Sequence, residues 1–478
     1  MNNKDFNLEE KDIYKLFNEV KMEESEFNEM EEEISTIEKE RIKKNLNKKI
    51  KGQKGFKRLK YGSIAAAISL ISIIGIGTAS PAFAENIPVL SSITQTLNDK
   101  FGFHGEYEKY SQIVNKSVKD KGITFTLNEV LADDSKVVIG YTIKSDKKIS
   151  DEEAMFMLSS VKINGKMPGG SHGSSTGNYI DDYTYVGTEE IHTKIPEDSN
   201  KFNVDLNVSE IGNVKGKWNF AFSISKEELL KNSTVFKPNK KIDFPDSSAT
   251  IDKVVCSPID TSIFLSGKSK TKKSGGQGLL DYDYWIAFDD KGIELTPKGL
   301  GGGEGNLKEG TFTSEMNYIS MKNIPKYLTI IPCKITPSGG GGVSVDKNGK
   351  ETSIKMDTKQ PKEISKVIDG IYPIELPQGN MGKIIIKEIK TENNKTRVKY
   401  TAQGKAPYFQ AQDILIKDEK GKNIKIRDYN LRKDENNPNE FTKTFEALVP
   451  NKKYTIYTND FSNVDFGENL KFRIDLNK

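Results

Sequence analysis

The residues with the most obvious catalytic potential are a serine and a histidine in a glycine-rich stretch. Gly169, Ser171 and Gly173 match the G-x-S-x-G pattern of serine hydrolases, and His172 adjoins the serine. Such a nucleophile requires a sharp turn from a buried strand into a helix. Because the flanking sequence predicts neither element, a glycine-rich loop is favoured. A secreted hydrolase that uses Ser171 is therefore the weakest of three functional hypotheses.

Glycine-rich and acidic stretches could also bind ligands. Gly169–Gly177, Gly299–Gly305 and Gly339–Gly342 lack the following helix and the GK[ST] sequence of phosphate-binding loops, so we expect loops between strands. Asp281–Trp285 alternates acids with aromatics, and one face of such a strand could bind calcium or a sugar. A half-buried strand with a solvated acidic face is favoured, because the spacing of a calcium loop is missing.

The two cysteines, Cys256 and Cys333, can form a disulfide or remain two buried thiols, and the sequence leaves both readings open. The three histidines (His104, His172 and His192) lie far from both cysteines along the chain, so neither a metal site nor a cysteine nucleophile is predicted. We therefore expect no enzymatic activity and no cofactor.

The stretch around which the chain is organised is Tyr61–Ala84, which contains no charged residue. A helix needs roughly 20 apolar residues to cross a bilayer, and this run is long enough before Pro81 ends it. Residues 43–60 contain nine lysines and arginines and no acid. The positive-inside rule then predicts a single-pass protein in the cell membrane, with residues 1–60 in the cytoplasm and residues 85–478 outside.

A cleaved signal peptide is the alternative to a retained membrane anchor. Ala82–Ala84 resembles a cleavage site, after which the mature protein would begin at Glu85. The preceding leader is 60 residues long, however, and residues 1–42 carry 14 acids. Ordinary signal peptides begin with a short basic region, so the retained anchor is favoured.

The cytoplasmic segment is predicted to form amphipathic helices that bind a protein partner. Apolar residues recur at helical spacing at Ile13, Leu16, Phe17, Val20, Phe27, Met30, Ile34 and Ile37. So short a segment cannot bury both apolar faces in a core of its own. We therefore expect a partner on residues 1–50. A helical hairpin that dimerises and a solvated, charged stalk are the alternatives.

The charge of the chain is divided unevenly. Its net charge is +4, but residues 1–42 carry −8 and residues 43–60 carry +9, which leaves the rest close to neutral. That balance gives no electrostatic case for nucleic-acid binding. The lysine run is expected to set the topology and to touch anionic lipid headgroups.

Beyond the apolar run, period-2 alternation and frequent turn signals predict a mainly β chain. Three strand pairs share one spacing, in which two apolar residues of the returning strand follow the first strand at +9 and +11. They are Leu127–Val130 with Ile139 and Tyr141, Ile251–Val254 with Ile263 and Leu265, and Ile386–Ile389 with Val398 and Tyr400. The pairs begin 124 and 135 residues apart, close to the size of a sandwich domain.

This repeat predicts about three tandem β-sandwich domains of immunoglobulin-like type. We place them at residues 122–237, 238–360 and 378–478, after a connector at 85–121, with linkers near Pro238–Pro245 and Pro361–Pro377. Within the connector, Ile87–Phe103 is expected to form a short amphipathic helix that ends in a glycine-bracketed turn. Tyr107–Val118 is expected to lead into the first domain as a strand or a helix.

The order of these parts resembles a known family. A lone span that ends in SPAFAENIP is followed by IPVLSSITQTLNDKFG and by YEKYSQIVNKSVKDKGITFTLNEVLADDSKVVIGYTIKS. Over roughly residues 55–150, this sequence resembles Gram-positive membrane proteins that carry the domain of unknown function numbered 4179. PNKKIDFPDSSATIDKVV and the sequence after it look like the immunoglobulin-like domain that often follows in this family. The last hundred or so residues match only through the internal repeat.

The resemblance implies an anti-sigma-factor-like regulator. The helices at Ile13–Val20 and Phe27–Ile50 would then bind an extracytoplasmic-function sigma factor, and the β domains would sense the cell envelope. Residues 1–60 contain neither His nor Cys, so the zinc-binding form of this mechanism is excluded. The competing hypothesis is a membrane-anchored structural or adhesive protein of the cell surface that binds wall glycan or another protein.

Overall fold

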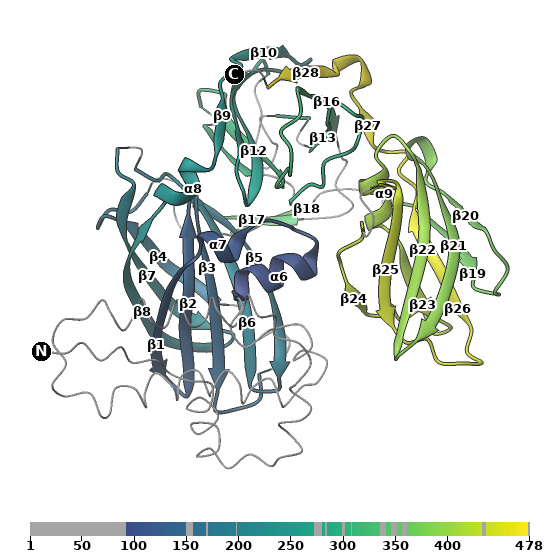
Figure 1. Ribbon diagram of the computed structural model, residues 1–478, viewed down its shortest axis with the longest axis horizontal. Coiled ribbons are helices and arrows are strands. Elements are labelled where there is room, and N and C mark those ends of the chain that lie inside the picture. Colours follow the sequence, from purple (N-terminus) through teal and green to yellow (C-terminus); the bar gives the residue numbers. More distant parts are fainter. Residues whose placement is uncertain are drawn as a thin grey trace, which may run out of the picture. The chain divides into compact units, whose positions relative to one another are not determined.

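The computed structural model describes residues 92–476, with gaps at 150–155, 169–170, 197, 272–279, 283, 299–301, 307, 335–340, 346–350, 356–360 and 433–435. The predicted cytoplasmic helices and the predicted span at residues 61–84 lie outside this part of the chain. Within it, no helix is both long and apolar enough to cross a membrane. The described chain is mainly β, in several sheets consistent with β-sandwich domains (Figure 1).

The first β-sandwich packs a sheet of order β1-β2-β3-β6-β5 against a sheet of order β4-β7-β8. These strands are β1 (Gln112–Asp120), β2 (Ile123–Ala132), β3 (Lys136–Ser145), β4 (Phe156–Ile163), β5 (Ser171–Asp181), β6 (Thr184–Thr193), β7 (Lys201–Ile211) and β8 (Val214–Ser225). Alternate apolar side chains face inward from both sheets. They build one core that includes the fully buried Phe125 and Trp218.

The second β-sandwich repeats the strand order in its larger sheet, β10-β11-β12-β15-β14, with β9 also paired to β11. In its smaller sheet, β16 pairs with β13, β27 and β28. These strands are β9 (Thr234–Phe236), β10 (Lys240–Asp243), β11 (Ser247–Cys256), β12 (Asp260–Ser269), β13 (Tyr284–Phe288), β14 (Gly302–Asn306), β15 (Thr311–Ile319), β16 (Tyr327–Lys334), β27 (Asp465–Phe466) and β28 (Phe472–Asp475). Trp285 lies in its core.

The third β-sandwich combines a sheet of order β20-β21-β22-β25-β24 with a sheet of order β19-β26-β23. These strands are β19 (Glu363–Val367), β20 (Ile374–Pro377), β21 (Gly382–Glu392), β22 (Lys395–Gly404), β23 (Leu415–Asp418), β24 (Ile426–Asp428), β25 (Glu440–Glu446) and β26 (Tyr454–Asn459). Tyr400 and Phe441 lie in its core. A separate two-stranded sheet joins β17 (Gly341–Val345) and β18 (Glu351–Lys355).

The described helices are short. They are α6 (Ile93–Phe101), α7 (Tyr107–Tyr110), α8 (Glu227–Lys231) and α9 (Pro407–Gln412), with 3-10 turns η1 (Gly379–Met381) and η2 (Glu468–Leu470). Helix α6 confirms the helix predicted after the span. The Ser92 side chain accepts a hydrogen bond from the backbone N–H of Gln95, and Gly102 ends the helix at φ 79°.

The predicted repeat of strand pairs is confirmed by the register of three hairpins: β2–β3, β11–β12 and β21–β22. The opposed residues are those of the +9 and +11 spacing, namely Val130 with Ile139 and Leu127 with Tyr141, Val254 with Ile263 and Ile251 with Leu265, and Ile389 with Val398 and Ile386 with Tyr400. A β-bulge interrupts each first strand at the same point, leaving Asn128, Asp252 or Lys387 without an opposite residue.

All three glycine-rich stretches contribute strands (β5, β14 and β17), so the prediction of loops was wrong. In the first sandwich the physical reason is a close approach of aromatic rings. A Cβ atom at Gly177 would lie 2.1 Å from the hydroxyl oxygen of Tyr185, and one at Gly187 would lie 2.3 Å from the ring of Tyr141. The glycines therefore leave room for two tyrosine rings that cross the sheet.

The predicted linkers also contain strands. Strand β10 lies within Pro238–Pro245, and β19 and β20 lie within Pro361–Pro377. Pro377 ends β20, an edge strand, where a missing N–H is tolerated. The end of the chain differs from the expected third domain as well. Strand β28 pairs with β16, and Ile474 and Leu476 are buried in the second core.

Candidate functional site

The structure places only some of the predicted site residues. The predicted partner-binding residues from Ile13 to Ile37 lie outside the described chain. Ser171 is the first residue of β5, a strand that continues to Asp181, so it does not sit on a turn into a helix. In the acidic–aromatic run, β13 begins only at Tyr284, whose side chain is buried, and Asp281 lies 3.6 Å from Lys334 as an ion pair.

Both cysteines are free, buried thiols in different hydrophobic clusters. Burial raises the pKa of Cys256 to about 12, so its thiolate is strongly disfavoured. The Sγ atom of Cys333 donates to the carbonyl of Ile331 at 3.5 Å. Neither sulfur is therefore poised as a nucleophile.

A buried carboxylate holds the helix that follows the predicted span. Oε1 of Glu129 accepts two hydrogen bonds at 2.7 Å, one from the Ser92 hydroxyl and one from the backbone N–H of Thr94. The Glu129 side chain is almost fully buried, and burial raises its pKa. Helix α6 also packs Leu97 against Ile180 and Val186 of the first sandwich. The start of α6 is thus fixed to strand β2.

The bulge in β2 explains why Glu129 reaches the helix. One extra residue reverses the inward–outward alternation, so Leu127 faces the core while Glu129 faces outward, toward α6. The opposite residue is Gly140, where a Cβ atom would lie 2.8 Å from Glu129 and 2.8 Å from the Thr94 hydroxyl. From the sequence, Leu127–Val130 was recognised only as part of the repeat, and the role of the Glu129 carboxylate was not predicted. The signal was an acid directly after the bulge and a glycine across from it.

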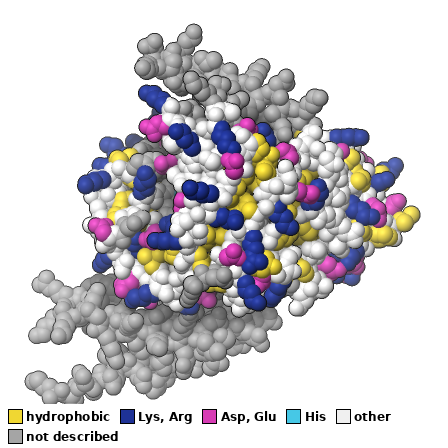
Figure 2. Space-filling view, turned by 90° about the horizontal axis from the view of Figure 1, so that it is seen from above, with side chains coloured by type: hydrophobic (Ala, Val, Ile, Leu, Met, Phe, Trp, Pro, Cys, Tyr) yellow, Lys and Arg dark blue, Asp and Glu magenta, His cyan; other side chains and the backbone are white. Residues whose placement is uncertain are grey.

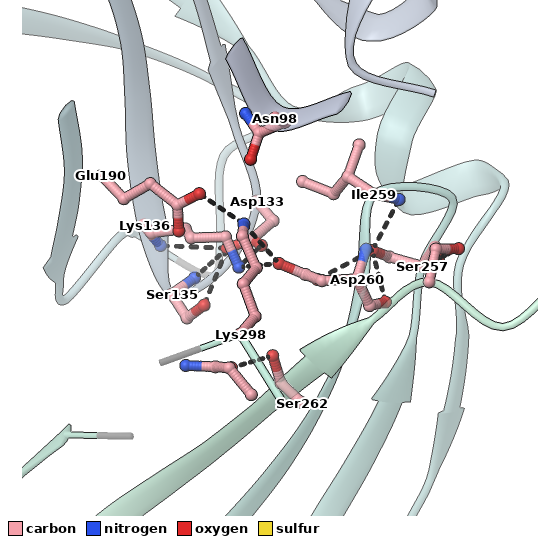
Figure 3. A network of polar contacts seen from close by, with 12 residues as sticks. Asn98, Asp133, Ser135, Lys136, Glu190, Ser257, Ile259, Asp260, Ser262 and Lys298 are labelled. Atoms are coloured by element: carbon pink, nitrogen blue, oxygen red, sulfur yellow. Dashed lines mark hydrogen bonds and ion pairs between the residues drawn. The ribbon is translucent and has the colours of Figure 1, made fainter. Parts of the chain in front are cut away.

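A second cluster of buried charges joins the first and second sandwiches. It consists of Asp133, Lys136, Glu190, His192, Asp260, Lys298 and Glu315, and we call it the inter-sandwich cluster. Nζ of Lys136 lies 2.5 Å from Asp260 and 3.2 Å from Asp133 (Figure 3). Lys298 pairs with Glu190 and lies 3.8 Å from Asp260.

The electrostatics of the cluster hold its central pair in the charged state. Burial alone would lower the pKa of Lys136, but the nearby carboxylates of Asp133 and Asp260 raise it well above its usual range. Burial would likewise raise the pKa of Asp260, but Lys136 and Lys298 lower it. Removing either partner would leave the other charge buried without its closest counter-ion.

A third buried contact joins the second and third sandwiches. Oε2 of Glu294 accepts a hydrogen bond from the backbone N–H of Tyr408 at 2.6 Å, at the start of α9. Nη1 of Arg432 donates to the carbonyl of Glu294 at 3.1 Å and to the hydroxyl of Thr296 at 3.2 Å. Burial raises the pKa of Glu294 to about 7, although the Tyr408 N–H and Arg432 oppose this shift.

The buried polar contacts described above connect helices and strands that are distant along the chain. Their carboxylates are paired with a cation, a hydroxyl or a backbone N–H, except that of Glu315, which meets the imidazole of His192 and leaves its Oε1 without a hydrogen bond. Among the described residues, no group of three or more His, Cys, Asp and Glu side chains could hold a metal ion. On the face seen in Figure 2, basic and acidic side chains are interspersed. The arrangement therefore connects the sandwiches to one another and connects α6 to the first sandwich.

Two family models match parts of the chain. Residues 54–145 match the model of DUF4179, a domain of unknown function, and residues 233–376 match that of DUF5643, a family of unknown function. The chain thus contains one segment similar to DUF4179 and one segment similar to DUF5643. The first match runs from before the predicted span to the end of β3, so it includes α6, Glu129 and Gly140.

Two solved structures are similar to parts of this chain. The conserved domain protein from Bacillus anthracis is 20% identical, covers 56% of this chain and 93% of its own, and has a TM-score of 0.42. The N-terminal periplasmic domain of ScsB from Proteus mirabilis is 12% identical, covers 52% and 99%, and has a TM-score of 0.16. No curated protein matches the chain.

Proposed function

We propose that this protein is a single-pass membrane regulator of anti-sigma type. Residues 1–50 bind a sigma factor in the cytoplasm, the apolar run at 61–84 crosses the membrane, and three immunoglobulin-like sandwiches outside sense the state of the envelope. The uncharged run with its one-sided basic flank supports this topology. The DUF4179 match and the resemblance described above support the regulatory role.

The observation that carries the proposal is that Glu129 accepts hydrogen bonds at the start of α6. Helix α6 begins at Ile93, soon after the predicted span ends at Ala84. If the segment after a membrane helix were a free linker, movement outside would not reach the membrane. Here two hydrogen bonds to Glu129 and the packing of Leu97 fix the segment to the first sandwich. A change in the sandwiches therefore acts on the chain close to the membrane.

The direct test is binding of residues 1–55 to sigma factors. We expect this segment to bind one extracytoplasmic-function sigma factor encoded in the same genome, measured by calorimetry with each purified sigma factor. A matched control replaces Leu16 and Phe17 by aspartate, which removes the apolar stripe and should abolish binding. Deletion of residues 120–478 should leave this binding intact. If no sigma factor binds, the regulatory proposal fails.

A cell-surface binding protein is the second candidate, and a groove on the second sandwich favours it. The groove has a volume of about 940 Å³ and runs over β10, β11, β12, β14 and β15. Polar groups such as Lys268 and Glu304 line it, with Phe312 among its apolar residues. Binding of isolated cell walls by the full chain, and its loss when residues 120–478 are deleted, would favour this role.

A further inference from the structure

The second sandwich is completed by the last strand of the chain. Strand β28 pairs antiparallel with β16, placing Leu328 opposite Ile474 and Ile330 opposite Phe472. The Ile474 side chain is fully buried in the second core, and Leu476 is buried beside it. The ring of Phe472 meets that of Trp285 edge-on at 5.3 Å. The whole third sandwich therefore lies, in sequence, between two parts of the second.

In the smaller sheet of each sandwich, one edge strand pairs with the central strand. This edge strand comes from a different place along the chain in each sandwich. In the first, β7 pairs with β8, which follows it directly along the chain. In the second, the counterpart of β7 is β16, and its partner is β28. In the third, the counterpart of β7 is β26. Its partner is β19, which precedes the other strands of that sandwich along the chain. All three pairings are antiparallel.

The order of strands along the chain shows which edge strand each sandwich would have if the strands were not exchanged. Strand β8 follows β7 and comes before the next sandwich. By the same order, β19 follows β16 after the separate hairpin β17–β18 and comes before β20, and β28 follows β26 after the short β27. The DUF5643 match at residues 233–376 includes β19 and most of β20 and excludes β28. By strand order, therefore, β19 corresponds to the second sandwich and β28 to the third.

We propose that β19 and β28 are exchanged between the second and third sandwiches, and that β28 is a strap whose place on β16 the same segment can take when another chain supplies it. Without the strap, β16 would present an open edge that could accept this segment from a second copy of the chain. This inference is independent of the sigma-factor proposal.

The two exchanged strands are anchored unequally. In β28, Ile474 is fully buried and Phe472 packs on the core, whereas every residue of β19 except the half-buried Ile364 is exposed. The specificity of the β16 edge therefore resides in the apolar side chains of β28. A peptide that keeps the backbone but loses Ile474 should not occupy that edge.

The test uses the full chain truncated after Val464 and a synthetic peptide of residues 465–478. Amide hydrogen exchange is measured in β16, with β2 and β3 of the first sandwich as an internal reference. We expect truncation to speed exchange in β16 at least about tenfold and to leave β2 and β3 unchanged. The peptide should restore protection. A peptide with Lys471→Ala should do so equally, because Lys471 is exposed, but one with Ile474→Asp should not.

The proposal is overturned if β16 stays protected after truncation. It is also overturned if the peptide fails to restore protection while β2 and β3 remain protected. Should truncation unfold the first sandwich too, the full-length Ile474→Asp variant decides. Loss of protection confined to the second and third sandwiches supports a strap, whereas unchanged protection of β16, or loss throughout the chain, refutes it.

Discussion

At the scale of single residues, two buried glutamates perform the same task. Glu129 and Glu294 each accept a backbone N–H at the start of a helix, from Thr94 in α6 and from Tyr408 in α9. The first N–H groups of a helix have no partner within it, and the helix dipole favours negative charge there. Burial opposes that charge and raises the pKa of both side chains.

The raised pKa of Glu294 predicts that acid stabilises the contact between the second and third sandwiches. The pKa rises from 4.5 to about 7 on folding, so the folded state binds the proton more tightly. This stabilisation is fully present below pH 4.5 and is lost as the pH rises through 7. Glu294→Gln keeps an acceptor for Tyr408 without the charge. It should therefore raise the free energy of unfolding at pH 8 by up to about 3 kcal/mol.

Urea unfolding between pH 5 and pH 8 measures this effect. The gain from Glu294→Gln should shrink steadily toward pH 5, where the wild-type side chain is protonated. Glu309→Gln is the control, because Glu309 lies exposed in the same sandwich. A gain that is equal at both ends of the pH range would show that Glu294 is not the titrating group.

At the scale of elements, the turns of two repeated hairpins meet through opposite charges. Lys136 and Asp260 hold the same position in their hairpins, each directly before the residue that opens the cross-strand pairing. Asp133 and Ser257 close the two turns through hydrogen bonds to backbone N–H groups. The two equivalent turns are thus joined, because Lys136 and Asp260 occupy equivalent positions and carry opposite charges. We call this contact the joint.

Breaking this joint should cost far more than breaking an exposed ion pair. Lys136→Met leaves Asp260 buried with only the more distant Lys298 and should lower the free energy of unfolding by about 3–5 kcal/mol. Adding Asp260→Leu should recover part of that loss, and a double-mutant cycle measures the coupling. The exposed pair of Lys119 and Asp146 is the control, with at most about 1 kcal/mol expected. Additive effects at Lys136 and Asp260 would contradict the joint.

The hairpins were predictable from sequence because their information is local. Apolar alternation and the short turn set the register of β2–β3, and the same spacing recurs in β11–β12 and β21–β22. The glycine strands were misread because the rings that lie over Gly177 and Gly187 come from other parts of the sheet. Glu129 was missed because a bulge, which the alternation does not encode, turns it toward α6.

At the scale of the whole molecule, the sandwiches form one connected series. The inter-sandwich cluster joins the first to the second, and Glu294 together with the exchanged strands joins the second to the third. The mainly β architecture and its internal repeat were predictable. The exchange of β19 and β28 was not, because the partner of β16 lies more than a hundred residues away and no local pattern selects it.

The central step of the proposed function is that α6 carries a change in the sandwiches to the membrane. The direct measurement is transcription from a promoter that depends on the partner sigma factor, in cells under envelope stress. They carry the wild-type chain, Glu129→Ala or Glu388→Ala. Glu388 occupies the equivalent bulge position in the third sandwich, where its side chain is 46% exposed and pairs with Lys399.

We predict that Glu129→Ala alters the stress response several-fold, because the Ser92 hydroxyl and the Thr94 N–H lose their acceptor and α6 loosens from β2. Glu388→Ala should respond as the wild type does, at equal protein levels by immunoblot. The contradicting result is an unchanged response in Glu129→Ala cells while hydrogen exchange on the purified variant shows that α6 has come free.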